Sequence, residues 1–241
     1  MRDDGRNRRK IGPMFDALAP RYDLLNRLLS LGIDRYWRRR AVRWLDLPRQ
    51  GLILDAASGT GDVALEIARQ GSSELQLVAC DLSPGMLKRA RHKMRKRFYG
   101  GRFWLLLGDC EALPLQTAVC VGAIIAFGIR NVGDRRAGLR ELRRVLKPGA
   151  PLVVLEFSQP LRPLLRACYL FYFRRILPFI GGLLSDSSAY RYLPDSVQNF
   201  PARNEFKQML TEAGFAEPEH LDLSAGIVTL YRARNPGENL D

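Results

Sequence analysis

Short apolar runs alternate with amphipathic stretches through the middle of the chain. The apolar runs are GLILDA (51–56), LQLVAC (75–80), RFWLLL (102–107), VGAIIAF (121–127) and PLVVLEF (151–157). Helical patterns at 61–70, 84–97 and 134–146 lie between most of these runs. Continuous apolar strands that alternate with helices are typical of a parallel sheet that is buried on both faces. The pattern therefore predicts an α/β fold with a Rossmann-like, doubly wound sheet.

The N-terminal part of the chain follows a different period. Residues 14–47 carry helical periodicity, and Phe15, Leu18, Tyr22 and Leu25 fall on one face of it. We expect residues 11–48 to form a helical lid over the ligand site. The preceding residues 1–10 are charged and polar, so they predict a disordered basic arm.

The C-terminal third also departs from the alternation. Residues 158–199 are rich in Pro, Tyr and Phe and fit no strand–helix–strand unit, which indicates an inserted cap. A helix is expected at about 203–213, followed by an antiparallel pair of strands in EPEHLDL (217–223) and GIVTLYRA (226–233). Residues 11–234 are thus expected to form a single domain, with a disordered tail at 235–241.

Composition narrows the class of protein. The chain has 241 residues and a net charge of +13, so it suits one globular domain with a basic surface. That surface indicates either an anionic partner or an arginine bias spread over solvated positions. The four cysteines, Cys80, Cys110, Cys120 and Cys168, are scattered, which argues against a disulfide scaffold or a metal site and suits a reducing cytoplasm.

Neither a signal peptide nor a membrane span is predicted. The first ten residues are charged and contain no apolar core segment. The most lipophilic stretch, residues 164–185, is interrupted by Arg166, Arg174, Arg175 and Pro178. It therefore falls short of the roughly 18 uninterrupted apolar residues that a span requires.

A glycine loop follows the first predicted strand. In ILDAASGTGDVA (53–64), Gly59 and Gly61 allow the backbone to approach a ligand closely. The loop also fits a dinucleotide-binding template, but Asp62 at the helix start would repel a pyrophosphate by several kcal/mol at about 4 Å. Asp55 ends the strand and adds a second carboxylate. The cationic methyl donor S-adenosylmethionine suits these acids better.

Two further acids end the next two strands. Asp81 follows the second strand and is placed to bind a ribose diol through charge-assisted hydrogen bonds. Its alternative role is to cap the helix that starts near Pro84, although Ser83 suits that role better. Asp109 and Cys110 follow the third strand and are placed to border an adenine, with an ordinary loop carboxylate as the alternative for Asp109.

With these residues in hand, the chain resembles the ubiquinone/menaquinone biosynthesis C-methyltransferases, a branch of the S-adenosylmethionine-dependent methyltransferases. The resemblance covers about residues 14–233. It rests on YDLLNRLLSLGIDRYW (22–37), LDAASGTGD (54–62), AFGIRNVGD (126–134), LKPGAPLVVLEFS (146–158), YRYLPDSVQNFP (190–201) and AGIVTLYRA (225–233). The glycine loop is shared by many methyltransferases, whereas FGIRN and YRYLP are far more specific.

The resemblance implies a class I methyltransferase with seven strands, the last of them antiparallel. It implies methyl transfer to a prenylated quinol ring and cofactor contacts at Thr60, Asp81, Asp109 and Cys110 and near Ala126. The YLPxSVxxFP form looks more like the menaquinone or phylloquinone members than the ubiquinone ones. Demethylmenaquinol is the expected acceptor, and a ubiquinone-pathway benzoquinol or a phylloquinone-pathway naphthoquinol is the alternative. The oligomeric state stays open, a homo-oligomer included. The chain departs from the family pattern at Leu25, Ala57, Ser58, Thr117, Val121 and Ala150.

Arg130 and Asn131 follow the fourth strand and should face the reaction pocket, because ligands bind at the carboxyl edge of such sheets. We hypothesise that Arg130 helps a quinol hydroxyl to ionise, while Asn131 orients it. The alternative for Arg130 is a structural ion pair with Asp134. Tyr22 is expected on the lid, with packing in the core as the alternative. Either Tyr22 or Asn131 is expected to hold the water that accepts the proton.

The inserted cap is the expected prenyl-tail site. Its apolar residues are Leu170, Phe171, Phe173, Ile176, Leu177, Phe179 and Ile180, and its cations are Arg166, Arg174 and Arg175. This composition predicts peripheral contact with the anionic inner face of a membrane, with an ordinary amphipathic cap helix as the alternative. Two other classes compete with the quinol enzyme: a nucleic-acid methyltransferase, for which no base-flipping motif is present, and a non-catalytic scaffold.

Overall fold

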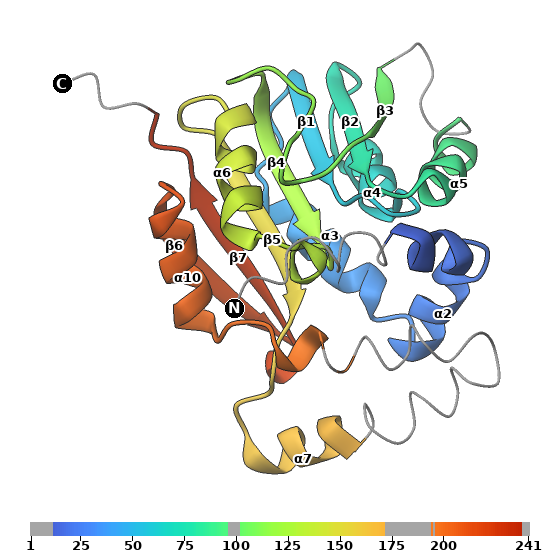
Figure 1. Cartoon of the computed structure of the whole chain (residues 1–241), viewed down its shortest axis with the longest axis vertical. Coiled ribbons are helices and arrows are strands. Elements are labelled where there is room, and N and C mark those ends of the chain that lie inside the picture. The colour runs from blue at the N-terminus through green and yellow to red at the C-terminus, as the bar shows by residue number, and fades with distance from the viewer. Residues whose placement is uncertain (1–11, 96–101, 172–193, 195, 238–241) are drawn as a thin grey trace.

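The computed structural model describes residues 12–95, 102–171, 194 and 196–237. Seven strands form one sheet in the order β3-β2-β1-β4-β5-β7-β6 (Figure 1). They are β1 (Gly51–Ala56), β2 (Leu75–Asp81), β3 (Phe103–Leu107), β4 (Cys120–Ala126), β5 (Pro151–Phe157), β6 (Ala216–Leu223) and β7 (Val228–Arg234). The first five strands pair in parallel, and β7 runs antiparallel to both of its neighbours. The predicted sheet, with its antiparallel last strand, is confirmed.

Helices cover both faces of this sheet. The main helices of the described residues are a short one over residues 12–18, α2 (Tyr22–Leu29), α3 (Asp34–Trp44), α4 (Asp62–Gln70), α5 (Pro84–Met94), α6 (Arg135–Val145), α7 (Pro163–Phe171) and α10 (Arg203–Glu212). One apolar core joins α6 and α10 to the sheet, and the other joins α3 and α4 to it. Figure 1 shows α6 and α10 in front of the strands. The molecule is therefore a three-layer α/β/α structure.

Side chains that alternate along each central strand enter opposite cores. In β1, Leu54 belongs to the core under α6, and its neighbour Ile53 belongs to the core under α3. In β4, Ile125 and Ile124 divide in the same way. All four side chains have no exposed surface. Because both faces of the strand are buried, an uninterrupted apolar run is required, which explains the pattern that predicted the fold.

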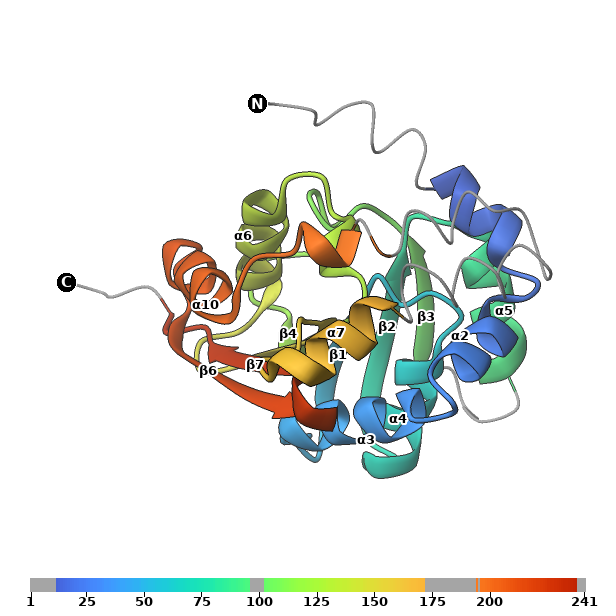
Figure 2. The same cartoon turned by 90° about the horizontal axis from the view of Figure 1, so that it is seen from below.

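The helical stretch predicted at the N-terminus consists of three helices. The chain breaks before α2, close to Pro20, and again after it, where Leu31 and Gly32 both adopt positive φ angles of 51° and 77°. The two parts have different roles. α3 packs into the core through buried residues such as Trp37, whereas α2 lies at the carboxyl end of the strands (Figures 1 and 2). The part of the expected lid that lies beyond the strand ends is thus residues 12–29.

Several predicted segments lie outside the described residues. These are the arm at 1–10, most of the insert between 172 and 193, and the end of the tail at 238–241. Within the described part of the insert, α7 lies beyond the carboxyl ends of the strands (Figure 2). No helix among the described residues is long and apolar enough to cross a membrane.

Candidate functional site

A cavity opens at the carboxyl ends of the central strands. Its space is about 760 Å³ when the solvent-open mouth is included. It is lined by Gly12, Phe15, Tyr22, Ala57, Gly59, Asp81, Leu82, Ser83, Met86, Gly108, Asp109, Cys110, Glu111, Ala126, Phe127, Gly128, Asn131, Val132 and Gly133. Residues from the lid and from the ends of four strands thus meet around one space, at the edge where doubly wound sheets bind ligands.

Asp81 holds the glycine loop in place at the floor of this cavity. Its carboxylate accepts hydrogen bonds from the backbone N–H of Gly59 at 2.7 Å and of Ser83 at 2.9 Å. Burial raises the pKa of Asp81, although both backbone bonds oppose the shift. The cap of α5 is Ser83, whose hydroxyl accepts from the N–H of Met86 at 3.1 Å. The prediction that Ser83, and not Asp81, caps this helix is confirmed.

Gly61 must be a glycine for two reasons. Its φ is +81°, a conformation that side chains disfavour, and an added Cβ would lie 3.1 Å from the Cβ of Ala90. The loop therefore packs closely on α5 before it opens α4.

Two of the predicted acids support the loop from outside the cavity lining. Asp55 is 1% exposed, accepts from the N–H of Ala64 at 3.1 Å, and has a pKa raised well above its usual value by burial. Burial also acts to raise the pKa of Asp62, but the cations of Arg38 and Lys93 outweigh it and lower that pKa. The charge of Asp62 is thus compensated within the protein. The preference for a cationic ligand must come instead from the acids that line the cavity, Asp81, Asp109 and Glu111.

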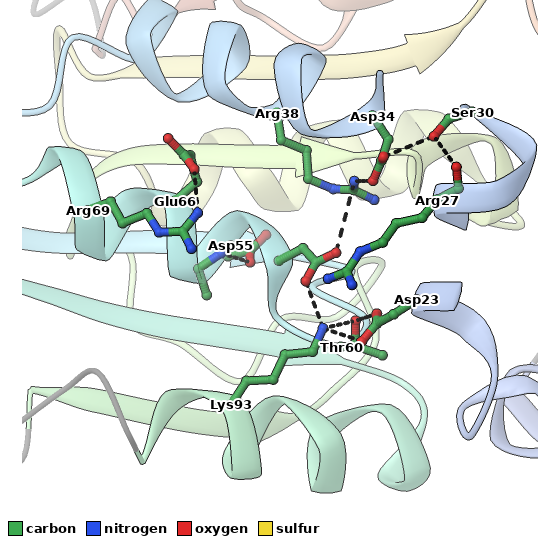
Figure 3. Close-up of polar contacts among 12 residues, drawn as sticks. Asp23, Arg27, Ser30, Asp34, Arg38, Asp55, Thr60, Glu66, Arg69 and Lys93 are labelled. Carbon is green, nitrogen blue, oxygen red and sulfur yellow. Dashed lines mark hydrogen bonds and ion pairs between the residues drawn. The ribbon is translucent and has the colours of Figure 1, made fainter. Parts of the chain in front are cut away.

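The lid is tied to the glycine loop by polar contacts (Figure 3). Asp23, next to Tyr22 on α2, accepts a hydrogen bond from the Thr60 hydroxyl at 2.5 Å. The Lys93 ammonium lies 2.6 Å from the Asp23 carboxylate and 2.9 Å from the Thr60 hydroxyl. On the cavity side, the Tyr22 ring approaches the loop, since a Cβ built on Gly59 would lie 3.8 Å from it. These contacts place the aromatic ring of the lid against the ligand loop.

Arg130 lies behind the cavity wall and is not among the lining residues. Its Nη1 donates to Glu156 Oε1 at 2.7 Å and to the Phe127 carbonyl at 2.6 Å. The guanidinium carbon is 5.5 Å from the centre of the Phe157 ring. Arg130 is 8% exposed and Glu156 is fully buried. The partner of Arg130 is therefore Glu156 on β5.

The expected alternative partner of Arg130, Asp134, has another role. Its carboxylate accepts from the N–H of Ala137 at 3.0 Å and so caps α6. Asn131, in contrast to Arg130, does line the cavity. The 3₁₀ turn Ile129–Asn131 thus places one residue of the Arg-Asn pair inward and the other toward the ligand space.

The predicted site residues divide into two groups. Those that line the cavity are Tyr22, Gly59, Asp81, Asp109, Cys110, Ala126 and Asn131, and those placed behind its wall are Asp55, Thr60, Gly61 and Arg130. Sequence reasoning missed Phe15, Met86, Phe127 and Glu156. The signal for Glu156 was a single acid within the apolar run PLVVLEF, which is unusual in a strand buried on both faces.

The lining fits S-adenosylmethionine. Asp81 presents a carboxylate at the end of β2, and Gly59 has no side chain that would block a ligand from the loop. The acids that line the cavity suit a cationic ligand. Among the described residues, no group of three or more His, Cys, Asp or Glu side chains is placed to hold a metal ion.

Comparisons with known proteins show the family of the chain. The model of the ubiE/COQ5 methyltransferase family matches residues 3–235. A ubiquinone/menaquinone biosynthesis C-methyltransferase of Syntrophotalea carbinolica is 56% identical over 96% of each chain. A demethylmenaquinone methyltransferase of Bacteroides fragilis is 40% identical over 96% of this chain and 94% of its own.

A solved structure shares the fold at much lower identity. An S-adenosylmethionine-dependent methyltransferase from Aquifex aeolicus has a TM-score of 0.61 and 16% identity, over 81% of this chain and 88% of its own. The family model covers nearly the whole chain, and the identity to curated relatives is high. The chain therefore belongs to the ubiE/COQ5 methyltransferase family.

Proposed function

We propose that the protein methylates a ring carbon of a prenylated quinol, converting demethylmenaquinol to menaquinol. The observation that carries the proposal is family membership together with the name of the 40% identical relative, a demethylmenaquinone methyltransferase. A ubiquinone-pathway benzoquinol is the second candidate, because the 56% identical relative is named for both quinones.

Some residues of the cavity are assigned to the methyl donor and others to the acceptor. Asp81 is suited to accept hydrogen bonds from the hydroxyls of the donor's ribose. The adenine of the donor would be bordered by Asp109, Cys110 and Ala126. When bound, S-adenosylmethionine supplies an electrophilic methyl group. Tyr22 and Asn131, two further polar side chains of the lining, are assigned to the acceptor.

The acceptor must become electron-rich before it reacts. A phenol ionises near pH 10, so at pH 7 the phenolate is disfavoured by about 4 kcal/mol. We assign Asn131 to orient the ring hydroxyl and Tyr22 to hold the water that takes its proton. Alignment of the ring carbon with the methyl group provides the remaining acceleration.

Arg130 acts, in this proposal, as a positioning residue. Its guanidinium is bound by Glu156 and the Phe127 carbonyl, and this fixes the turn that carries Asn131. A direct catalytic effect of the charge makes a different prediction. Arg130→Lys keeps the positive charge but loses the planar guanidinium. The variant should lose most of its activity if Arg130 acts by positioning the turn. It should keep most of its activity if the positive charge alone is enough.

Methyl transfer to defined acceptors tests the function. The purified protein is incubated with methyl-labelled S-adenosylmethionine and a short-chain demethylmenaquinone, either reduced or oxidised, and in parallel with total RNA. We expect label on the ring carbon of the reduced quinol alone. Label in RNA would support a nucleic-acid enzyme, and no label anywhere in a donor-binding protein would support a scaffold.

The exposed apolar side chains point to a peripheral membrane contact. Of the eleven large ones among the described residues, eight come from two segments, the α2–α3 region and residues 161–171, which include α7: Leu24, Leu28, Leu31, Ile33, Tyr36, Leu161, Leu164 and Phe171. Both α2 and α7 lie beyond the carboxyl ends of the strands (Figures 1 and 2). The exposed charges of these segments are arginines, including Arg35, Arg162 and Arg166. We propose that this face meets the anionic inner leaflet that holds the prenylated substrate, from the cytoplasmic side.

Vesicle sedimentation tests this contact. The full chain should bind vesicles that contain anionic lipid and release them at high salt. Leu28→Ser with Leu31→Ser should weaken binding at least tenfold, whereas Trp104→Gln, which changes an exposed aromatic on the edge strand β3, should not. Equal binding by all three proteins would reject this face.

A further inference from the structure

Lys93 lies at a junction between three elements: the lid, the glycine loop and α4. The proposed chemistry gives Lys93 itself no role. Its ammonium reaches from α5 to Asp23 on the lid at 2.6 Å, to the Asp62 carboxylate at the start of α4 at 2.7 Å, and to the Thr60 hydroxyl at 2.9 Å (Figure 3). All three donor positions of an ammonium are thus occupied. One side chain joins the lid, the glycine loop and the helix that the loop opens.

This junction is shielded from water. The side chains of Lys93 and Asp23 are 19% and 21% exposed, and that of Asp62 is 22% exposed. Ion pairs at this depth are less screened than surface pairs, whose contribution is often close to zero. The Thr60 hydroxyl strengthens the arrangement, because it donates to Asp23 while it accepts from Lys93.

Apolar packing alone gives α2 little hold on the rest of the protein. Among its described side chains only Leu25 is buried, while Leu24 and Leu28 are 61% and 45% exposed. The segment before it is held in a similar polar way, since Asp16 accepts from the Ser83 hydroxyl at 2.5 Å and from the Gly85 N–H at 2.8 Å. Polar contacts therefore carry much of the attachment of the lid.

Two of the three partners of Lys93 are direct chain neighbours of residues that line the cavity. Asp23 follows Tyr22, and Thr60 follows Gly59. Lys93 itself is not a lining residue. Any influence on the ligand must therefore pass through the lid and the loop.

We propose that Lys93 is a positioning residue that locks the lid to the glycine loop, so that donor binding and lid closure favour each other. When the donor holds the glycine loop, Thr60 and Asp62 have fixed positions. Lys93, bound to both, then fixes Asp23 on the lid and with it the neighbouring Tyr22. By reciprocity, a closed lid raises the affinity for the donor by the same factor. The proposal rests on S-adenosylmethionine as the donor but not on the identity of the acceptor.

Donor binding to the full-length protein is the first test. Calorimetry with S-adenosylmethionine should give a Kd about tenfold higher for Lys93→Met, which is about 1.4 kcal/mol. Lys93→Arg retains the charge and should recover to within about threefold of the wild type. Arg49→Met removes an exposed ion pair with Glu74 and serves as the matched control, with no change in Kd.

A double variant separates the lock from two independent effects. Asp23→Asn should weaken donor binding as Lys93→Met does. If the two residues act through one contact, the combined variant should be no more than about twofold weaker than Lys93→Met alone. Losses that multiply would overturn the lock.

Hydrogen exchange without ligand supplies a readout that loss of general stability would not produce. In Lys93→Met the amides of α2 should exchange faster, while those of β1 and β4 keep their wild-type rates. Faster exchange throughout the sheet, or unchanged exchange in α2, would reject the proposal. A protein that passes these tests but methylates no quinol would refute the proposed acceptor and leave the lock standing.

Discussion

At the residue scale, the buried pair of Arg130 and Glu156 is the least expected feature of the site. Two charges have been removed from water beside the ligand space, although such pairs often give no more stability than apolar side chains of similar size. A role in positioning the turn Ile129–Asn131 gives a physical reason for keeping them.

Stability and activity should respond differently when this pair is removed. Glu156→Gln leaves a buried cation without its counter-charge and should lower the unfolding free energy by about 3–5 kcal/mol. Arg130→Met combined with Glu156→Leu should regain most of that stability but stay at least tenfold less active. Denaturant unfolding and steady-state rates measure both effects. A fully active double variant would show that the pair serves stability only.

Asp55 makes a prediction about pH. Its pKa in the folded protein is raised by burial, so folding favours the protonated acid. The stability it contributes is complete below its unfolded pKa of about 4 and is lost as the pH rises through the raised folded value. Asp55→Asn should therefore raise Tm at pH 7 by about 2–4 °C, equivalent to about 1 kcal/mol.

The same comparison at low pH is the check on Asp55. The gain in Tm should shrink as the pH falls below the raised folded pKa and disappear below about pH 4, where the wild-type acid becomes neutral in both states. Thermal scans of the ligand-free proteins at several pH values measure the difference. A gain that is constant with pH would assign the effect to packing instead.

At the element scale, the helices and strands of the sheet were predictable, and the contacts between elements were not. The apolar run 51–56 and β1 coincide because a strand buried on both faces needs mostly apolar residues, with Asp55 as the exception at its end. Glu156, however, lies 26 residues from Arg130 and meets it only through the pairing of β4 with β5. Lys93 likewise meets Asp23 across the fold. Sequence periodicity carries no information on such distant partners.

Two loops at the carboxyl edge fit each other through small residues. A Cβ on Gly128 would lie 2.5 Å from the Cβ of Ala57, so the β4 and β1 loops touch there. Gly128→Ala should destabilise the protein by about 1–3 kcal/mol through overpacking. Ala57→Gly in the same chain should recover most of the loss.

Denaturant unfolding and donor binding of these loop variants test whether the contact between the two loops causes the loss of stability. Ala57 has a positive φ of 48°, so Ala57→Gly relieves strain in any background, and Gly149→Ala, whose added Cβ has no neighbour within 4 Å, measures that general gain. The recovery of Gly128→Ala by Ala57→Gly should exceed it. If Ala57→Gly failed to rescue Gly128→Ala, the contact between the loops would not be the cause of the loss.

At the scale of the whole molecule, the sheet order explains where chemistry can occur. The order of the strands reverses between β1 and β4, and the cavity lies at that point. Strand-end residues Asp81 and Asp109 could be assigned to it from sequence because parallel strands end at a common edge. The placement of Arg130 behind the wall could not, since it depends on which way a 3₁₀ turn faces.

The quinone content of living cells tests the central claim most directly. A bacterial strain that lacks its own demethylmenaquinone methyltransferase is supplied with this protein, and its quinones are analysed by mass spectrometry. The account predicts menaquinone that is one methyl group heavier than the accumulated precursor, and much less of it with Glu156→Gln expressed at the same level. Unmethylated precursor in the presence of folded wild-type protein would contradict it.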